Sequence, residues 1–384
     1  MKKYDSIIIG SGASGCMCAL TTKNKSVALI DNNNVVAKKI LVTGNGKCNL
    51  TNLNTNSTRY NTNIDKFLNK FGVTDTLNFF KSYGLETYAD EDNRVYPISN
   101  SAKSVLDILE HNLKNKVDTY LNSNVTSIEK TTTGFKVYTD NDVFESNKLV
   151  IATGGNSIVN ALTQLNIKFD NFTPSLVALK TNSTKALTNV RLSNVKVTAT
   201  SNNKTMVDCG EVLFKDSGVS GIVVFNLSTL FARTQNYNGS ISIDILPNIE
   251  TSKLIEMLTE RKKLNVVVSK FFVGLFQNQV AEEIFKQSKV NTNLNSTKLT
   301  NADIEDLANT IKNLTFTVNG CYDNNQVYCG GVNLNGLTDN LEYIDIPNLY
   351  FTGEICNVDG ECGGYNLQWA WTSGHIVGEL LWLN

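Results

Sequence analysis

Apolar residues at the start of the chain form two short runs separated by a helical stretch. Residues 4–9 (YDSIII) and residues 27–30 (VALI) each contain consecutive apolar positions, which predicts two buried strands. The stretch between them is glycine-rich at first and is predicted to be helical to about residue 23. A strand, a helix and a second strand in this order predict a βαβ unit with parallel strands.

The pattern of apolar positions changes twice further along the chain. Helical spacing over 101–116 and strands at 135–139 and 147–152 continue the first pattern. From Pro174 to residue 247 the apolar positions fall in short alternating segments, which predict antiparallel strands. Residues 251–313 predict three or four helices, and after about residue 320 a strand at 349–351 and a helix at 365–382 restore the first pattern. The chain is therefore expected to hold one α/β domain interrupted by an insert in two parts.

Composition and charge exclude several classes of protein. The chain has 384 residues, 35 Lys and Arg, 36 Asp and Glu, and a net charge of −1, which argues against binding to DNA by bulk electrostatics but leaves a local basic groove open. The eight cysteines form no CxxC pair and there are only two histidines, so we expect no metal site and reduced thiols. The longest apolar run near the start, residues 7–9, is too short for an export signal, and no run is long enough to span a membrane. We therefore expect a cytoplasmic protein.

A glycine motif between the first two strands carries the first chemical signal. Gly10-x-Gly12-x-x-Gly15 follows a predicted strand and opens a predicted helix. The first glycine permits a tight turn, the second lets the backbone approach a pyrophosphate, and the third lets the helix pack on the strand. Asp31 follows the second strand at the position where an acid binds a ribose hydroxyl. This combination predicts a dinucleotide site.

Three further loops favour FAD over a nicotinamide dinucleotide. Residues 43–49 (TGNGKCN), 152–155 (ATGG) and 352–366 each follow or precede predicted elements and are rich in Gly and Asn. Several loops from distant parts of the sequence suit one extended ligand. The last loop leads directly into a helix at Tyr365, whose N-terminus would stabilise the anion of a reduced flavin.

The chain resembles the BaiN/YhiN-type flavoproteins over essentially its whole length. The resemblance rests on residues 40–52 (ILVTGNGKCNLTN), 94–99 (RVYPIS), 212–221 (VLFKDSGVSG) and 353–371 (GEICNVDGECGGYNLQWAW). It implies an α/β fold with a Rossmann-like FAD-binding domain of the three-layer, glutathione-reductase type, interrupted by a β-barrel-like insert that carries a helical subdomain. The corresponding boundaries are 1–172 for the first part of the FAD domain, 173–250 for the β-rich insert, 251–317 for the helical subdomain and 318–384 for the C-terminal part of the FAD domain.

The resemblance also implies which residues bind noncovalent FAD. They come from six parts of the chain: Gly10, Gly12, Ala13, Ser14, Gly15, Asp31, Lys39, Thr43, Gly44, Gly46, Asn49, Val125, Thr153, Gly154, Gly353, Glu354, Asp359, Gly364, Tyr365, Asn366 and Leu367. No second Gly-x-Gly-x-x-Gly motif appears between residues 100 and 320, so a dedicated NAD(P)H domain is not expected. NAD(P)H is then expected to reach the flavin by transient docking.

The chemistry shared by this family is hydride transfer from a flavin to a conjugated C=C bond. Cys48, Lys47 and Arg94 are the catalytic candidates. Cys48 would donate a proton or only pack beside the flavin, and Arg94 would polarise a carbonyl or form a structural ion pair.

The resemblance favours a substrate in RNA but leaves alternatives open. The preferred hypothesis is reduction of uridine to dihydrouridine in 23S ribosomal RNA or its precursor. The insert supports it with lysines at Lys253, Lys262, Lys263, Lys270, Lys286 and Lys289. The alternatives are an NAD(P)H-dependent small-molecule enone reductase or amine-type oxidase, and a non-redox FAD-binding protein.

Overall fold

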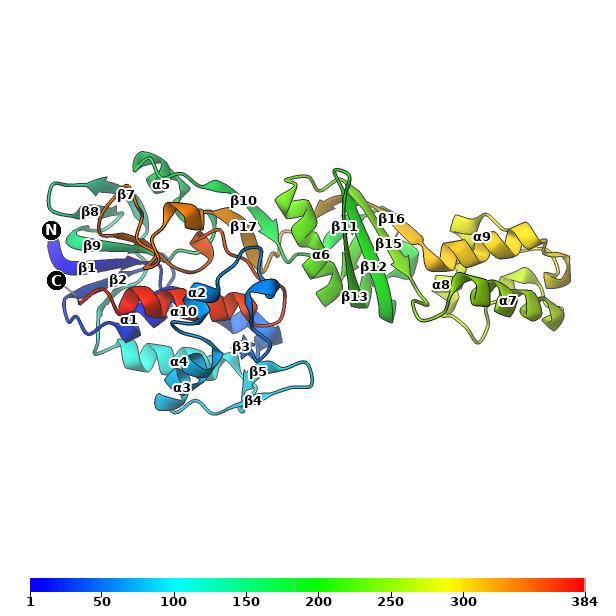
Figure 1. Ribbon diagram of the computed structural model, residues 1–384, viewed down its shortest axis with the longest axis horizontal. Helices are drawn as coiled ribbons and strands as arrows, with labels where there is room; N and C mark the ends of the chain where they lie inside the picture. Colours follow the sequence, from blue (N-terminus) through cyan, green and yellow to red (C-terminus); the bar gives the residue numbers. More distant parts are fainter. Residues whose placement is uncertain (183, 383–384) are drawn as a thin grey trace. The chain divides into compact units, whose positions relative to one another are not determined.

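The chain folds into two compact units in a computed structural model, which describes residues 1–182 and 184–382. Unit 1 comprises Met1–Thr173 and Val327–Asn384, and unit 2 comprises Pro174–Gln326 (Figure 1). The boundary expected from the sequence, after residue 317, would cut strand β16 (Leu314–Cys321). The pairing of β16 with β11 continues to Cys321. The units therefore divide after Gln326.

A seven-stranded mixed sheet forms the centre of unit 1. Its parallel strands are, in spatial order, β6 (Asp118–Tyr120), β2 (Val27–Ile30), β1 (Lys2–Ile9), β9 (Val143–Ile151) and β18 (Leu349–Phe351). The first half of β9 also pairs with β8 (Phe135–Thr139), which pairs with β7 (Val125–Lys130), and both of these pairings are antiparallel. All of β2 and the C-terminal ends of β1 and β9 are buried, as expected of parallel strands covered on both faces.

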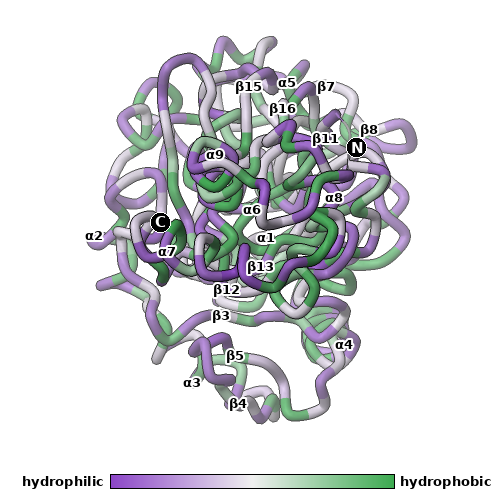
Figure 2. Tube along the Cα trace, turned by 90° about the vertical axis from the view of Figure 1, so that its right-hand side faces the viewer, coloured by the Kyte–Doolittle hydropathy of each residue, from purple (hydrophilic) through white to green (hydrophobic). Residues whose placement is uncertain are grey.

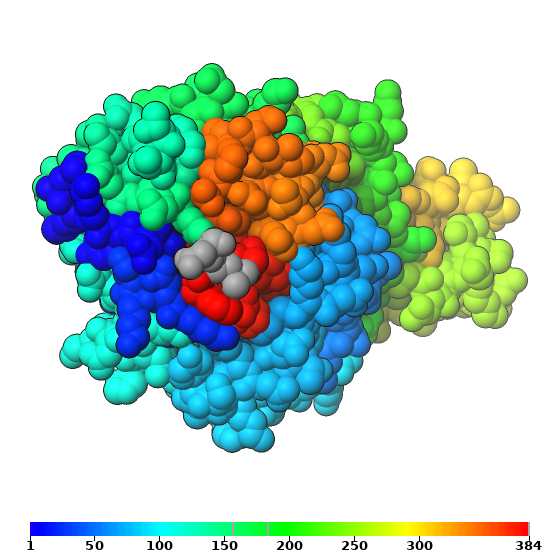
Figure 3. Space-filling model, turned by 60° about the vertical axis from the view of Figure 1, so that its left-hand side comes forward, coloured from blue at the N-terminus to red at the C-terminus, as the bar shows by residue number. Residues whose placement is uncertain are grey.

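Helices cover one face of this sheet. They include α1 (Ala13–Thr21), α4 (Ala102–Leu113) and α10 (Tyr365–Gly378), and α1 lies against both others (Figure 1). The observed α10 ends four residues earlier than the predicted helix at 365–382. The other α-helices described in unit 1 are α2 (Asp65–Leu68), α3 (Val73–Ser82) and α5 (Val159–Gln164). In the space-filling view of Figure 3, the red C-terminal residues are set between blue N-terminal segments and the orange segment that precedes them.

A small sheet lies beside the N-terminal half of α10. It consists of β3 (Thr51–Asn52), β5 (Arg94–Pro97) and β4 (Thr87–Ala89). The Nε1 of Trp371 in α10 donates to the Leu50 carbonyl at 2.9 Å, just before β3. The Oγ1 of Thr51 donates to Oε1 of Gln368 at 2.6 Å. These buried hydrogen bonds fix β3, and with it β5, against α10.

Unit 2 contains a closed six-stranded barrel and a group of helices. The barrel order is β11 (Leu179–Thr181), β14 (Gly218–Ser220), β13 (Lys204–Lys215), β12 (Arg191–Ser201), β15 (Gly239–Asp244) and β16. Helix α6 (Ile222–Arg233) packs on β12 and β13, and α7 (Thr251–Arg261), α8 (Asn278–Ser288) and α9 (Asn301–Lys312) follow. Helix α9 carries both hydrophilic and hydrophobic residues (Figure 2), and its buried residues Ile304, Leu307, Ala308 and Ile311 recur at helical spacing. The strands β10 (Asp170–Ser175) and β17 (Val327–Gly331) pair where the chain passes between the units.

The observed architecture confirms the predicted fold class. A Rossmann-like α/β sheet is interrupted by an antiparallel barrel that carries helices. Helix α6 is the main element that the pattern does not predict. Its first residues, Ile222-Val223-Val224-Phe225, form a continuous apolar run that does not distinguish a strand from a helix.

Candidate active site

The geometry explains differently why a glycine stands at each of the three positions of the first loop. Gly10 has φ +101°, and a Cβ there would lie 2.5 Å from the Ala152 carbonyl oxygen. A Cβ on Gly15 would lie 1.9 Å from the Gly10 carbonyl oxygen, so both positions are closed to a side chain. Around Gly12, by contrast, the nearest protein atom to an added Cβ is 4.0 Å away. The middle glycine therefore borders open space at the N-terminus of α1, where a pyrophosphate is favoured by N–H groups and the helix dipole.

The loop after β9 lies beside this glycine turn. β1 and β9 are adjacent parallel strands, and α1 follows β1 back to β2 on the other side. A ligand in such a sheet binds outside the carboxyl ends of the strands where the strand order reverses. Thr153 and Gly154 follow β9 at that place. Gly154 has φ +75° with no atom within 4 Å of an added Cβ, and the buried Thr153 Oγ1 has no hydrogen-bond partner among the described residues.

Asp31 has a structural role at the end of β2. Its Oδ2 accepts hydrogen bonds from the Ser11 backbone N at 2.6 Å and from Ser11 Oγ at 2.8 Å. Its Oδ1 accepts from the backbone N of Asn33 at 2.7 Å and from Asn33 Nδ2 at 2.8 Å. The carboxylate predicted to bind a ribose thus also ties the glycine loop to β2. Val125, another predicted contact residue, begins β7. Two residues before it, the Ser123 N donates to the Asp31 carbonyl at 2.9 Å.

The N-terminus of α10 is a second place that favours negative charge. Gly364 caps the helix with φ +100°, and a Cβ there would lie 2.6 Å from Thr51 backbone atoms and 2.8 Å from Asn49 Oδ1. Asn49 is 8% exposed, and its Oδ1 has no hydrogen-bond partner among the described residues. The first N–H groups of the helix, at Tyr365 to Leu367, have no intrahelical acceptor. This acceptor and these donors suit a polar heterocycle.

Other predicted contact residues connect the loops to one another. Lys39 Nζ pairs with Glu354 Oε2 at 3.2 Å, and Glu354 Oε1 accepts from the Tyr328 N at 3.0 Å. A Cβ on Gly353, which has φ +74°, would lie 2.5 Å from Ser14 Oγ in the first turn of α1. Glu354 therefore links three segments of the chain, and the neighbouring Gly353 connects them to the first turn of α1.

The residues before and within the first turn of α10 hold their own loop in place. Asn366 Nδ2 donates to the Gly360 carbonyl at 2.8 Å, and its Oδ1 accepts from the Gly360 N at 2.9 Å. The buried Asp359 Oδ2 accepts from Cys329 Sγ at 3.3 Å. The buried Tyr365 accepts a hydrogen bond at its carbonyl from Tyr60 Oη at 2.8 Å.

Residues 43–49 form a tight loop whose only buried side chains are at its end. Gly44 and Gly46 have φ +54° and +82°, and Thr43 Oγ1 donates to the Ile40 carbonyl at 2.7 Å. Lys47 is exposed on the loop. Cys48 has φ +60°, is 0% exposed and belongs to the hydrophobic core of unit 1. Burial raises the pKa of its thiol to about 12, although Thr43 opposes the shift. Its position favours the packing role over proton donation.

Arg94 is held by two acidic neighbours. Its Nε pairs with Asp90 Oδ2 at 2.8 Å, and its Nη2 pairs with Asp92 Oδ2 at 2.7 Å. Asp90 Oδ1 also accepts from the Arg94 backbone N at 2.9 Å. This arrangement favours the structural ion pair, which keeps the guanidinium in one orientation. Cys362 and Tyr96, which sequence reasoning did not single out, lie close to it. The position of Cys362 directly before the Gly363-Gly364 pair was the available signal.

The residues present fit FAD in two independent respects. Gly374 of α10 faces Ser14 of α1 and Gly378 faces Cys18, so the two helices run parallel. At a rise of about 1.5 Å per residue, the N-terminus of α10 extends ~12 Å beyond that of α1. A single phosphate cannot reach both helix ends, whereas an extended dinucleotide can. Gly12 and Gly154 border open space on the first part of that path.

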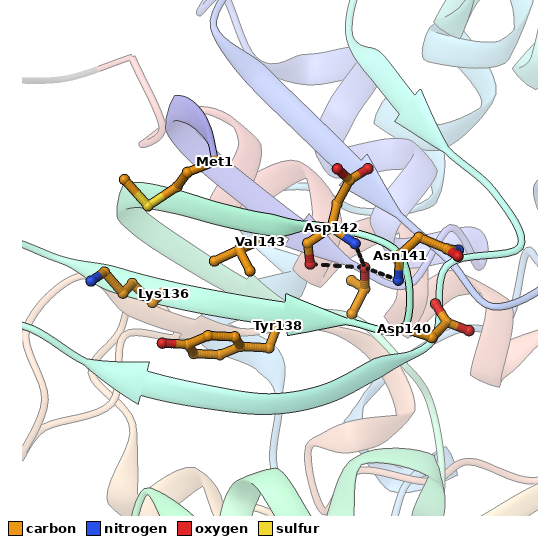
Figure 4. A pocket seen from close by; sticks show the side chains of 8 residues that line it. Met1, Lys136, Tyr138, Asp140, Asn141, Asp142 and Val143 are labelled. Atoms are coloured by element: carbon orange, nitrogen blue, oxygen red, sulfur yellow. Dashed lines mark hydrogen bonds between the residues drawn. The ribbon is translucent and has the colours of Figure 1, made fainter.

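A surface hollow elsewhere in unit 1 is unsuited to this cofactor. It has a volume of about 460 Å³ and is lined by Met1 and the β8–β9 turn, in which Thr139 Oγ1 accepts from the backbone N atoms of Asn141 and Asp142 (Figure 4). Lys2 and Phe144 are register partners at the amino ends of β1 and β9. The hollow therefore lies at the opposite end of these strands from Gly10.

The described residues include neither a metal-binding cluster nor a membrane-spanning helix. No group of three or more His, Cys, Asp or Glu side chains within 1–182 and 184–382 is arranged to hold a metal ion. No helix in the same ranges combines the length and the apolar character needed to cross a bilayer.

A family model and two curated relatives match nearly the whole chain. The family model described as the HI0933-like protein Rossmann domain matches residues 4–380. A 3-dehydro-bile acid delta(4,6)-reductase from Clostridium scindens is 33% identical over 409 aligned residues, covering 97% of each chain. A ribosomal RNA dihydrouridine synthase from Escherichia coli is 28% identical, covering 97% of this chain and 96% of that protein.

A solved structure shares the fold at low identity. It is 3-ketosteroid delta1-dehydrogenase from Sterolibacterium denitrificans, with a TM-score of 0.50 and 11% identity over 98% of this chain and 99% of that chain. The family match, the full-length relatives and the geometry of the loops lead to one conclusion. The chain belongs to the HI0933-like Rossmann-domain family and is a flavin-dependent oxidoreductase with a Rossmann-like FAD-binding fold.

Proposed function

We propose that the protein reduces a conjugated C=C bond with FAD, and that the predicted contact residues hold this cofactor. The observation that carries the proposal is the full-length similarity to relatives named as a bile acid delta(4,6)-reductase and as a ribosomal RNA dihydrouridine synthase. Both names describe saturation of a C=C bond. In a 3-dehydro-bile acid and in uridine alike, that bond is conjugated to a carbonyl, so both substrates suit hydride addition.

The chain's own residues would supply binding and charge. The N–H groups of Ala13, Ser14 and Gly15 would bind the pyrophosphate, since Gly12 leaves the approach open. The N-terminus of α10 would favour negative charge beside Gly364. Bound FAD would supply the hydride. NAD(P)H, docking transiently, is the proposed source of electrons.

Uridine in 23S ribosomal RNA is the proposed substrate. Residues 261–298 of unit 2 support RNA binding with seven basic residues against two acidic ones, Glu282 and Glu283. The basic residues are Arg261, Lys262, Lys263, Lys270, Lys286, Lys289 and Lys298. Phosphate contacts from such residues supply affinity without reading sequence.

A small-molecule enone is the second candidate. It is favoured by the higher identity to the bile acid reductase, 33% against 28% for the RNA enzyme. One experiment separates the two: the purified protein is incubated with NADH or NADPH and either 23S ribosomal RNA or a 3-dehydro-4,6-diene bile acid. Dihydrouridine that forms in the RNA, and that is absent from the RNA of cells lacking the gene, supports the first substrate. A saturated steroid without dihydrouridine supports the second. If neither product forms, the proposal is overturned.

A further inference from the structure

Two cysteines lie near the N-terminus of α10, and they differ in exposure. Cys48 is 0% exposed in the core, whereas Cys362 is partly exposed in the loop that leads into α10. A proton donor must be within reach of its substrate. Only Cys362 satisfies this condition among the two.

The loop that contains Cys362 is fixed on the small sheet. Asn52 Nδ2 donates to the Gly363 carbonyl at 3.0 Å, and Asn52 is the register partner of Arg94 across β3 and β5. Arg94 and Tyr96 alternate with buried Val95 and Pro97, so their side chains lie on one face of β5. A Cβ on Gly44 would lie 3.2 Å from Tyr96 Cε1. The glycine loop 43–49, the β5 face and the Cys362 loop therefore meet at one place.

Asn49 provides an independent sign that a ligand belongs there. Its side chain is more than nine-tenths buried, and its unpartnered Oδ1 points at the space beside Gly364. A buried acceptor without a donor costs about 1–3 kcal/mol, so such groups are normally satisfied. A ligand N–H at the start of α10 would satisfy this one.

We propose that Cys362, positioned beside Arg94 and Tyr96, is the proton donor of the C=C reduction. The inference rests on the proposed function. The β-carbon of the substrate receives a hydride from the reduced cofactor, and the α-carbon takes the proton as the Cys362 S–H bond breaks. The electron pair of that bond stays on sulfur, the cofactor is oxidised by two electrons, and water reprotonates the thiolate.

The local charges suit this cycle. Burial raises the pKa of the Cys362 thiol to about 11, so the proton is present at neutral pH. Arg94 opposes the rise, and its guanidinium is held in place by Asp90 and Asp92. Tyr96 is the other titratable group that faces the thiol from β5. The fixed cation stabilises the thiolate left after proton transfer.

The kinetic test compares Cys362→Ala and Cys362→Ser with the wild-type holoenzyme and with Cys209→Ser, a change of an exposed thiol in unit 2. Anaerobic stopped-flow separates flavin reduction by NAD(P)H from reoxidation by whichever of the two proposed substrates the wild type reduces. Cys362→Ala should slow reoxidation by ~10²–10⁴-fold, the usual contribution of a general acid, with flavin reduction and FAD content unchanged. Cys362→Ser should recover part of the rate, and Cys209→Ser should match wild type. An unchanged reoxidation rate in Cys362→Ala overturns the proposal.

Thiol labelling supplies a readout that does not depend on turnover. Iodoacetamide is applied to the holoenzyme at about pH 9 with and without the substrate, and peptides are quantified by mass spectrometry. Cys362 should be alkylated and protected at least tenfold by substrate, while Cys209 is alkylated equally in both and Cys48 in neither. Labelling of Cys362 that substrate leaves unchanged contradicts the proposal. If the wild type reduces neither substrate, the proposed function and the proton-donor role both fall. Labelling of the protein with and without FAD then shows separately whether Cys362 lies at the cofactor.

Discussion

The carbonyl oxygen of Ser14 in α1 lies 2.3 Å from the position that a Cβ on Gly374 of α10 would occupy. Gly378 makes a similar close approach to Cys18, one turn later in both helices. Two elements that are 360 positions apart in sequence are therefore in backbone contact. This contact sets the N-terminus of α10 at a fixed offset from the glycine loop, and the proposed FAD site depends on it.

Gly374→Ala should destabilise unit 1. Alanine favours a helix over glycine by about 1 kcal/mol, but a Cβ at 2.3 Å from a backbone oxygen forces α1 and α10 apart. Overpacking of this kind costs about 1–3 kcal/mol, so the clash outweighs the propensity. Urea unfolding measures the difference. Asn309→Ala, at an exposed position of α9, is the control and should change stability by no more than about 0.5 kcal/mol.

Gly12→Val should separate FAD binding from folding. Gly12 has an extended backbone with φ −68° and open space around an added Cβ, so the fold accepts a side chain that fills the proposed pyrophosphate position. The variant should keep wild-type stability without ligand and lose bound FAD. Gly15→Ala should instead destabilise the fold itself, because its Cβ would lie 1.9 Å from the Gly10 carbonyl oxygen. Released flavin and urea midpoints are measured for both; FAD retained by Gly12→Val contradicts the site.

Asp31→Asn should weaken FAD binding through the glycine loop. Asp31 Oδ2 accepts both hydrogen bonds from Ser11, and Oδ1 accepts both from Asn33. An amide has only one oxygen, so the Asp31→Asn variant would lose one of these two pairs and loosen the loop. Hydrogen bonds to a charged group contribute about 1.5–3 kcal/mol, which corresponds to a loss of affinity of roughly 10- to 150-fold. Ser11→Ala, which removes only the Oγ contact, should lose less. Titration of the flavin-free protein with FAD tests the order of the three affinities.

Cys48 should make the protein sensitive to alkaline pH. Its folded-state pKa of about 12 lies above the ordinary thiol value of 9.0, so its contribution to stability is complete below about pH 9 and is lost as pH rises toward 12. Over that window the stability advantage of wild type over Cys48→Ala should fall by up to about 1.4 kcal/mol per pH unit. Urea unfolding in reducing buffer at neutral pH and at about pH 10 tests this. The matched control is Cys209→Ala at an exposed site.

The glycine loop was predictable because its sequence signal is local. Gly10, Gly12 and Gly15 lie within six residues, and the surrounding apolar runs identify the strand and the helix, although the close approach of Ala152 to Gly10 follows only from the fold. The burial of Cys48 was not predictable, because it depends on packing against distant parts of unit 1. Asp31 shows an intermediate case. Its place at the end of β2 follows from the pattern, but its bonds to Ser11 follow only from the fold.

The ion pairs of Arg94 had a local signal that the sequence analysis did not use. Asp90 and Asp92 precede Arg94 by four and two positions, and a tight turn before β5 brings all three together. The proximity of Cys362 to Arg94 had no such signal. It arises because Asn52 holds the Gly363 carbonyl beside the small sheet.

Anaerobic reoxidation of the reduced holoenzyme tests the central claim most directly. The flavin is first identified by release and chromatography, then reduced chemically, and mixed without oxygen with 23S ribosomal RNA or with the 3-dehydro-4,6-diene bile acid. We expect FAD, and we expect one of the two substrates to restore the oxidised flavin spectrum with an equal amount of product that has gained two hydrogens. A flavin other than FAD, or FAD that stays reduced with both substrates and is reoxidised only by oxygen, would contradict the account.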